Sequence, residues 1–508
     1  MIIDRNLETK KSCVSKIVRQ KIYWDWRYSI IELKKHLEPG EIFRFVEKVN
    51  EKRRNKAVSI KEVLLLPDGT VAGRVGLKEG QIVLFKGDMI MEEIGGKKII
   101  HVRPLRFLPD GSLAGGVMLE DGRWVIFKGD AIIERIQGRR FREVNNIFVL
   151  PDGTLVGNLG FGIDRTTGLS KRILAFKGKT LISNIGGRKI REAYICHLQQ
   201  DGTLIGTATL EDGRNVPFKG ETLMAEIQGK KVIDTDRIFL ISLPNGSLAG
   251  VVKLEDNRRV PFKENTLIEE VQGRKVVKAS NLRSLSDGTL VGRVVLEGYN
   301  KWLFFKGDVL IERISGMEFK NAGILGVSSQ DILLGIIELE DNRHVPFEGE
   351  TIIDEIGGKK IIDAFPIFLL PDGSLAGVVK LEDGRRIPFK KKENILIEEI
   401  QGKRVIDTRF LVSLPDGTLA GVVRIEDNRI VPFKGCALLE NIHGRKILET
   451  NSFRALPDGS VSGRIEYESE TRPIMRAYDY FFWYEEDIYL PTSFNPKHMC
   501  KVKNELKD

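Results

Sequence analysis

The residues of this chain that could do chemistry are few and widely spaced. Its six histidines are His36, His101, His197, His344, His443 and His498, and its four cysteines are Cys13, Cys196, Cys436 and Cys500. Only Cys196–His197 and His498–Cys500 are close pairs, and neither has the ligand spacing of a metal site. The sequence contains no nucleophile elbow and no phosphate-binding loop with its helix. We therefore expect no metal and no cofactor, and no residue is predicted to be catalytic.

A glycine that recurs in one register dominates the sequence. Its ten copies are Gly73, Gly115, Gly157, Gly206, Gly250, Gly292, Gly335, Gly377, Gly421 and Gly463. Successive copies lie 42 to 49 residues apart, and most gaps are 42 to 44 residues. A period of this length is typical of repeated units that stack side by side. Residues shared by all copies mostly serve packing, so function is expected where copies differ.

The clearest unit runs from residue 409 to residue 450 and is divided by turns. Pro415-Asp416-Gly417 suits a tight turn between an antiparallel pair of strands, and Asp427-Asn428 marks a second hairpin. Turns every eight to twelve residues predict four strands per unit. The stretch after the last turn is either a fifth strand or a crossover. The repeated glycine lies inside the second strand, which indicates close backbone approach, a bulge or a bend.

The "PDG" turn between the first two strands resembles that of β-propeller proteins of the WD40 and NHL sort, over residues 58–490. No Trp-Asp dipeptide ends the third strand of a unit. A phenylalanine stands there instead, as in Phe85, Phe127, Phe176, Phe218, Phe262, Phe305, Phe347, Phe389 and Phe433. The resemblance implies an all-β repeat array, β-propeller-like, of about ten four-stranded units of about 42 residues. It carries over no active site. One ring of ten blades, two rings of five and an open solenoid all fit the repeat.

The net charge of +9 is concentrated near the start of the chain. Residues 1–57 contain 15 Lys or Arg against 8 Asp or Glu, so the repeats are nearly neutral. Basic pairs such as Lys97-Lys98 recur after the last turn of most units, eight in all, and could form a polyanion-binding ring. We favour pairing with acidic residues across hairpins, with Glu93 facing Lys98 and Glu120 facing Arg123. The lysine that follows most of the repeated phenylalanines is interpreted as a solvated strand end.

Residues 1–57 are predicted to form a basic helical extension, followed by the repeats at 58–490 and a tail at 491–508. One helix is expected from Cys13 to Leu37, and a shorter one carries Ile42, Phe45, Val46 and Val49. Aromatic and basic residues alternate in the first helix at Arg19, Lys21, Trp24, Trp26 and Arg27. These side chains either dock the helix on the repeats, stack nucleobases or bind a protein partner.

Two copies depart from the pattern. The third unit carries an insertion, Asn158 to Arg172, whose Arg165, Lys171 and Arg172 suit an acidic partner. The seventh unit has Asp331 where the turn glycine is expected, and it is either a seam or a drifted copy.

Taken together, these features predict a non-enzymatic cytoplasmic scaffold that binds a protein or peptide. The alternatives are a propeller-type hydrolase or lyase acting on a polar substrate, and nucleic-acid binding through residues 1–57. No run of 18 apolar residues occurs, so no membrane partner is expected.

Overall fold

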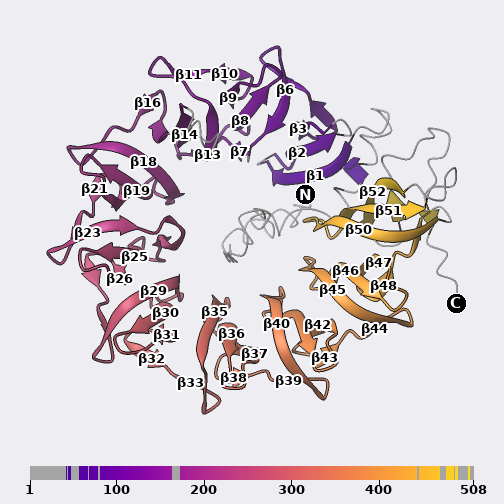
Figure 1. Cartoon of the computed structure of the whole chain (residues 1–508). Coiled ribbons are helices and arrows are strands. Elements are labelled where there is room, and N and C mark those ends of the chain that lie inside the picture. Colours follow the sequence, from indigo (N-terminus) through magenta and orange to yellow (C-terminus); the bar gives the residue numbers. More distant parts are fainter. Residues whose placement is uncertain are drawn as a thin grey trace, which may run out of the picture.

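The computed structural model is a ring of ten β-sheets, or blades, and each blade has four antiparallel strands in chain order (Figure 1). It describes residues 42, 44–46, 57–66, 68–77, 80–103, 105–162, 172–442, 445–468, 476–484, 487–489 and 502–503. The first strand of each blade lies nearest the centre of the ring, and the fourth lies outermost (Figure 1). The chain is a ten-bladed β-propeller.

In six blades the inner strand is the longest, and in the other four it is divided into two strands. They are β1 (Ala57–Leu65), β6 and β7 (Lys97–Val102, Arg106–Phe107), β12 and β13 (Arg139–Arg140, Glu143–Val149), β18 (Arg188–Leu198), β23 and β24 (Lys230–Thr235, Ile241–Ser242), β29 (Arg274–Ser284), β34 and β35 (Met317–Glu318, Asn321–Val327), β40 (Lys359–Leu369), β45 (Lys403–Ser413) and β50 (Arg445–Ala455). A single 3₁₀ turn, η2 (Arg237–Phe239), separates β23 from β24.

The next two strands form the middle of each blade. The second strands are β2 (Val71–Leu77), β8 (Leu113–Leu119), β14 (Leu155–Phe161), β19 (Leu204–Leu210), β25 (Leu248–Leu254), β30 (Leu290–Leu296), β36 (Leu333–Glu338), β41 (Leu375–Leu381), β46 (Leu419–Ile425) and β51 (Val461–Glu468). The third strands are β3 (Ile82–Lys86), β9 (Trp124–Lys128), β15 (Arg172–Lys177), β20 (Asn215–Lys219), β26 (Arg259–Lys263), β31 (Leu303–Lys306), β37 (His344–Glu348), β42 (Arg386–Lys390), β47 (Ile430–Lys434) and β52 (Arg476–Tyr484).

The outer strands are short. They are β4 (Met89–Met91), β10 (Ala131–Ile133), β16 (Thr180–Leu181), β21 (Thr222–Leu223), β27 (Thr266–Leu267), β32 (Val309–Ile311), β38 (Thr351–Ile352), β43 (Ile395–Leu396), β48 (Ala437–Leu438) and β53 (Asp487–Tyr489), with β54 (Val502–Lys503) beside the last. Short edge strands limit pairing with other molecules.

The stretch after the last turn of each unit is not a fifth strand of that unit but crosses to the next unit, which was the other predicted alternative. It is the beginning of the next inner strand, which pairs with a two-residue strand before it. These are β5 (Glu93–Ile94), β11 (Arg135–Ile136), β17 (Asn184–Ile185), β22 (Glu226–Ile227), β28 (Glu270–Val271), β33 (Arg313–Ile314), β39 (Glu355–Ile356), β44 (Glu399–Ile400) and β49 (Asn441–Ile442). Each small hairpin thus joins two blades.

The repeated glycine and phenylalanine form one packing unit. Gly421 lies opposite Phe433 across β46 and β47, and the same pairing recurs in all ten blades, ending with Gly463 and Phe481. A Cβ on Gly421 would lie 2.1 Å from Phe410 O and 2.9 Å from Phe433 Cε1. The φ of Gly421 is not positive. The predicted close approach is therefore confirmed, and it occurs where a bulge in β45 brings its backbone toward the glycine.

The turn residues adopt the conformations and hydrogen bonds that their types predict. Asp416 Oδ1 accepts a hydrogen bond from the backbone N of Thr418 at 2.8 Å, as expected for an aspartate that bonds its own turn. In the seventh blade, Asp331 adopts a φ of 60°, the conformation that glycine supplies elsewhere. Its carboxylate also accepts a hydrogen bond from Ser286 N of the sixth blade at 2.8 Å. The seventh unit is thus a drifted copy within a continuous ring.

The ring closes where the tenth blade meets the first, and β52 lies against β1 there. Among the residues that the structure describes, the four strands of every blade are consecutive in the chain, and no sheet combines strands from the two ends. The short helical segment at residues 42 and 44–46 packs at this junction. Its Ile42 and Val46 are buried in one cluster with Leu456 and residues of the first blade, and Ile42 N donates to Asp458 Oδ2 at 2.8 Å.

The longer helix predicted from Cys13 to Leu37 lies outside the described residues. Within the part of the chain that is described, no helix is both long and apolar enough to cross a membrane.

Candidate functional site

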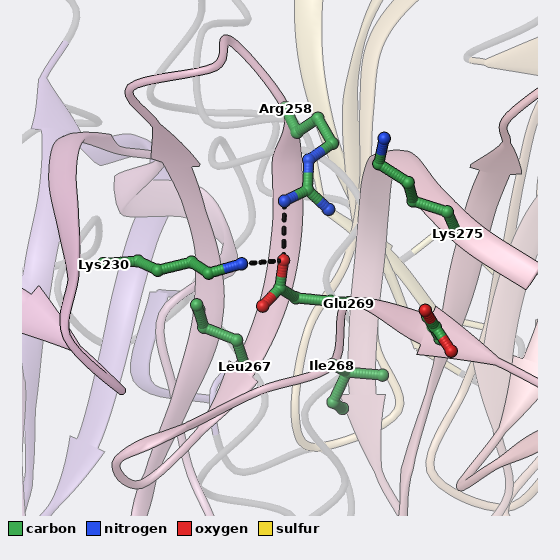
Figure 2. Close-up of a pocket in the computed structure, with 7 residues that line it drawn as sticks. Lys230, Arg258, Leu267, Ile268, Glu269 and Lys275 are labelled. Carbon is green, nitrogen blue, oxygen red and sulfur yellow. Dashed lines mark hydrogen bonds and ion pairs between the residues drawn. The ribbon is translucent and has the colours of Figure 1, made fainter. Parts of the chain in front are cut away.

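A pocket of about 660 Å³ opens where the fifth blade meets the start of the sixth (Figure 2). Three charged side chains meet in its wall. Glu269 Oε2 accepts a hydrogen bond from Lys230 Nζ at 2.7 Å and another from Arg258 Nη2 at 2.6 Å. Burial tends to raise the pKa of Glu269, but these two hydrogen bonds outweigh it and hold the pKa below its ordinary value. Glu269 is therefore an ionised, fully engaged carboxylate rather than a proton donor.

The same three-residue arrangement recurs around the ring. Lys359 and Arg385 bond Glu398 in the eighth blade at 2.6 to 2.7 Å, and Lys97 and Arg123 bond Glu134 in the second. Each trio ties the start of a blade to its central hairpin and its outer end. Because the trio belongs to the repeat, the charged wall of the pocket is part of the architecture and does not mark this blade for chemistry.

The second residue of most basic pairs also has an acidic partner. Lys98 bonds Glu120, and the equivalent pairs are Lys189–Glu211, Lys231–Glu255, Lys275–Glu297 and Lys360–Glu382. The preference for charge pairing over a polyanion-binding ring is confirmed for these residues. These pairs are solvent-exposed, so each contributes little to the stability of the fold.

One predicted charge pair is confirmed and another is wrong. Glu93 lies opposite Lys98 as expected. Glu120 does not face Arg123, because the guanidinium of Arg123 turns back to Asp121, at 2.7 Å from Nε, and to Glu134.

The interpretation of the lysines after the repeated phenylalanines as solvated strand ends is wrong for three of them. Lys263 Nζ donates to the carbonyl O of Gly288 in the next blade at 2.9 Å. Lys128 and Lys219 make the equivalent bonds to Gly153 and Gly246. Where Glu348 replaces the lysine, it pairs instead with Lys391 of the following blade. These side chains join neighbouring blades at their turns.

The insertion in the third blade is shorter than predicted. Asn158 to Phe161 belong to β14, and Arg172 begins β15 opposite Phe161, with its side chain exposed. Asn158 is fully buried, and its side-chain amide both donates to Ile195 O and accepts from Ile195 N at 2.8 Å. Asn158 therefore joins the third blade to the fourth. Arg165 and Lys171 lie outside the described residues, so a contact role for this hairpin stays a prediction.

The predicted binding residues of the first helix, Arg19, Lys21, Trp24, Trp26 and Arg27, also lie outside the described residues. Their proposed contacts with nucleic acid gain no support from the part of the chain that is described. For the second helix, packing on the repeats is confirmed, since Ile42 and Val46 are buried and the Phe45 and Phe85 rings are 4.4 Å apart.

The surroundings of the close pair Cys196–His197 indicate a role in packing rather than in chemistry. Burial raises the pKa of the Cys196 thiol to about 12, so this thiol is a poor nucleophile at neutral pH. His197 Nε2 lies 2.9 Å from Leu240 O of the next blade. No group of three or more potential ligands for a metal ion occurs among the described residues.

The inner strands carry a feature that the sequence argument missed. Phe107, Phe365 and Phe410 are 47%, 50% and 42% exposed, whereas the ten repeated phenylalanines are at most 1% exposed. Phe365 and Phe410 lie on β40 and β45, the inner strands of the neighbouring eighth and ninth blades (Figure 1). The signal was available in the alignment of the copies, because Asn146, Asn281 and Ser452 occupy the position of Phe410 in other inner strands.

Comparison with solved structures returns β-propellers among its matches. The chain is 16% identical to the WD40 β-propeller domain of Doa1, over 57% of this chain and 88% of that one, with a TM-score of 0.23. It is 11% identical to the Dos1 propeller, over 72% and 90%, with a TM-score of 0.27. A puromycin-hydrolysing peptidase of Mycobacterium tuberculosis matches at 12% identity over 83% and 60%, also with a TM-score of 0.27. No family model and no curated protein matches. These scores do not bear on function, which we argue from the residues.

Proposed function

We propose that this protein is an interaction scaffold that binds a protein or peptide through the inner strands of its eighth and ninth blades. The observation that carries the proposal is the exposure of Phe365 and Phe410. In the same two blades Phe389 and Phe433 are completely buried. Leaving large aromatic side chains in water costs free energy, and exposed apolar groups that cluster on a rigid surface are typical of binding sites.

Charged side chains accompany these two phenylalanines. Arg409, next to Phe410, bonds Glu449 of the tenth blade at 2.9 Å, and both side chains are about one-third exposed. Arg386 Nη2 donates to Phe365 O at 3.2 Å. Aromatic anchors with arginine beside them are the side chains that most often dominate the affinity of protein interfaces. Because the strands are held in the ring, little ordering would be needed on binding.

The alternative of a hydrolase or lyase has weaker support. Acid–base catalysis by two carboxyl groups needs one whose pKa is raised so that it holds a proton at neutral pH. Each resolved pKa shift of a carboxyl group among the described residues is downward, as in Asp372, where the hydrogen bonds from Ser374 and Lys392 hold the pKa low. Such groups stay ionised and hydrogen-bonded to their neighbours.

The test replaces the two phenylalanines together by serine, Phe365→Ser and Phe410→Ser, and compares affinity pull-downs from a lysate of the source cells. The matched control carries Met89→Ser and Val309→Ser, which remove apolar side chains that are 61% and 49% exposed on outer strands. We expect a partner that the wild type and the control recover but the double phenylalanine variant loses, with all three melting alike. Equal recovery of the partner by the wild type, the control and the double phenylalanine variant would exclude this surface. If the wild type recovers no specific partner, the scaffold function is contradicted.

A further inference from the structure

We propose that Arg237, Tyr194 and Asn146 form a binding site for the carboxylate group of a ligand, on the inner strands of the third, fourth and fifth blades. The Arg237 guanidinium and the Tyr194 hydroxyl bind the carboxylate, and Asn146 positions the hydroxyl. The site lies on other blades than Phe365 and Phe410, and it does not depend on the proposed scaffold function.

The inner strand of the fifth blade departs from the repeat at this place. Ile241 follows Thr235 by six positions, whereas the equivalent residues of the ninth blade, Thr408 and Val412, are four positions apart. The longer segment contains the 3₁₀ turn η2, which begins at Arg237 and separates β23 from β24. Arg237 is therefore placed by a feature of this blade alone, and function is expected where copies differ.

Tyr194 connects the three residues of the site. It lies on β18, and Cζ of Arg237 lies 4.9 Å from the centroid of its ring, which is a cation–π distance. Asn146 of β13 donates a hydrogen bond from Nδ2 to the Tyr194 hydroxyl at 3.2 Å. All three residues are partly exposed. The guanidinium and the hydroxyl are thus held on one aromatic side chain.

The Tyr194 hydroxyl has an unused donor. It accepts from Asn146, and it donates to no residue in the described part of the chain. Burial raises the pKa of Tyr194, so the hydroxyl keeps its proton at neutral pH. A protonated hydroxyl can donate one hydrogen bond to a ligand oxygen.

The donors of Arg237 are unused as well. Within the described residues its guanidinium makes no hydrogen bond and no ion pair. Stacking on the tyrosine occupies the face of the planar group, whereas its five N–H donors lie in the plane and stay available. The preceding residue does not neutralise it, because Asp236 pairs with Arg259 at 3.9 Å.

Other arginines of the ring stack on an aromatic side chain and also bond an acceptor of the protein. These arginines, each with its aromatic residue and its acceptor, are Arg103 (Trp124, Glu143), Arg274 (Tyr299, Glu312) and Arg293 (Trp302, Ala322 O). In each of them the aromatic ring orients the guanidinium and the protein supplies the acceptor. Arg237 has the ring without the acceptor, so we expect a ligand to supply it.

A carboxylate has the shape and the charge for this site. Its two oxygens can accept two parallel hydrogen bonds from one guanidinium. Its single charge balances that of Arg237, whereas a phosphoryl group carries about −1.5 to −2 charges at pH 7 and would keep part of its charge unpaired. Because the tyrosine already orients the guanidinium, little side-chain freedom is lost on binding.

The first experiment measures binding of two carboxylate probes to the full chain by saturation-transfer difference NMR. The probes are glutarate, a free organic acid, and the blocked peptide acetyl-Gly-Glu-Gly-amide, and the same peptide with glutamine in place of glutamate is the negative probe. We expect at least one carboxylate probe to bind, and the tighter of the two identifies the source as a small acid or an acidic side chain. Binding of neither, or a glutamine peptide that binds as tightly as the better carboxylate probe, would overturn the proposal.

Variants assign the binding to these residues. Arg237→Gln is expected to weaken binding about tenfold or more, and Tyr194→Phe, which removes only the hydroxyl, about fivefold. Arg237→Lys keeps the charge without the planar donors, so its affinity should lie between those of the wild type and Arg237→Gln.

The matched control is Arg274→Gln, which removes an arginine that stacks on Tyr299 at 5.3 Å but already bonds Glu312. We expect the control to bind the probe as the wild type does. Equal binding by Arg237→Gln and the control would contradict the assignment of the site. Circular dichroism melts check folding, and Arg237→Gln should melt with the wild type because its guanidinium bonds no described residue.

Discussion

Replacing Gly421 by valine is expected to destabilise the protein by about 4 kcal/mol or more, or to prevent its folding. The Cβ of any side chain there would lie 2.1 Å from Phe410 O, a contact that no rotamer relieves. The backbone of β46 cannot move away from this contact, because the bulge in β45 lies on one side of Gly421 and the buried ring of Phe433 lies on the other. Denaturant unfolding followed by circular dichroism measures the loss.

The matched control for this substitution is Gly292→Val, at the same position of the sixth blade. Its nearest atoms are Phe305 Cε1 at 2.9 Å, Leu282 Cδ1 at 3.3 Å and Ser280 O at 3.3 Å. Two of these three are the ends of side chains, which can move, so we expect a clearly smaller loss. Gly377→Val, with Pro366 O at 2.4 Å, should lie between the two. Equal and small losses at all three positions would show that the glycine is an ordinary strand residue.

Removing residues 1–57 is expected to leave a folded but weakened ring. The fragment 58–508 loses Ile42 and Val46, which are 1% and 0% exposed at the junction of the first and tenth blades. At about 1.5 to 3 kcal/mol for each buried side chain, the loss is roughly 3 to 6 kcal/mol as an upper bound. Circular dichroism should show a β-rich spectrum with an earlier unfolding transition.

A second fragment, 40–508, separates the contact from the rest of the extension. It keeps Ile42, Phe45 and Val46 but lacks the predicted basic helix. We therefore expect its unfolding transition to coincide with that of the full-length protein. If 58–508 is as stable as 40–508, the helical segment plays no part in closing the ring. If 58–508 is soluble but unfolded, the division into an extension and an independent repeat domain is wrong.

The sequence predicted the features of this fold that repeat and are local. Asp416 and Gly417 define a turn from their own backbone preferences, and a period of about 42 residues follows from counting such turns. The all-β fold and the four strands per unit were therefore accessible. The number of blades per ring was not, because closure depends on the angle between packed sheets.

The contacts between blades were also beyond a single sequence. Lys263 reads as an ordinary surface lysine until the turn of the next blade places the carbonyl of Gly288 beside it. Asn158 reads as the start of an inserted loop, yet it is buried against the backbone of Ile195.

One chain closes into a single ring of ten blades, in which the four strands of each described blade are consecutive in the chain. Cryo-electron microscopy of the full-length protein, averaged in views along the ring axis, tests this claim most directly. We predict a continuous ring with ten radial sheets, and with the tenth sheet packed against the first. Two separate rings of five sheets, or an open crescent with a gap between the tenth and first sheets, would contradict it.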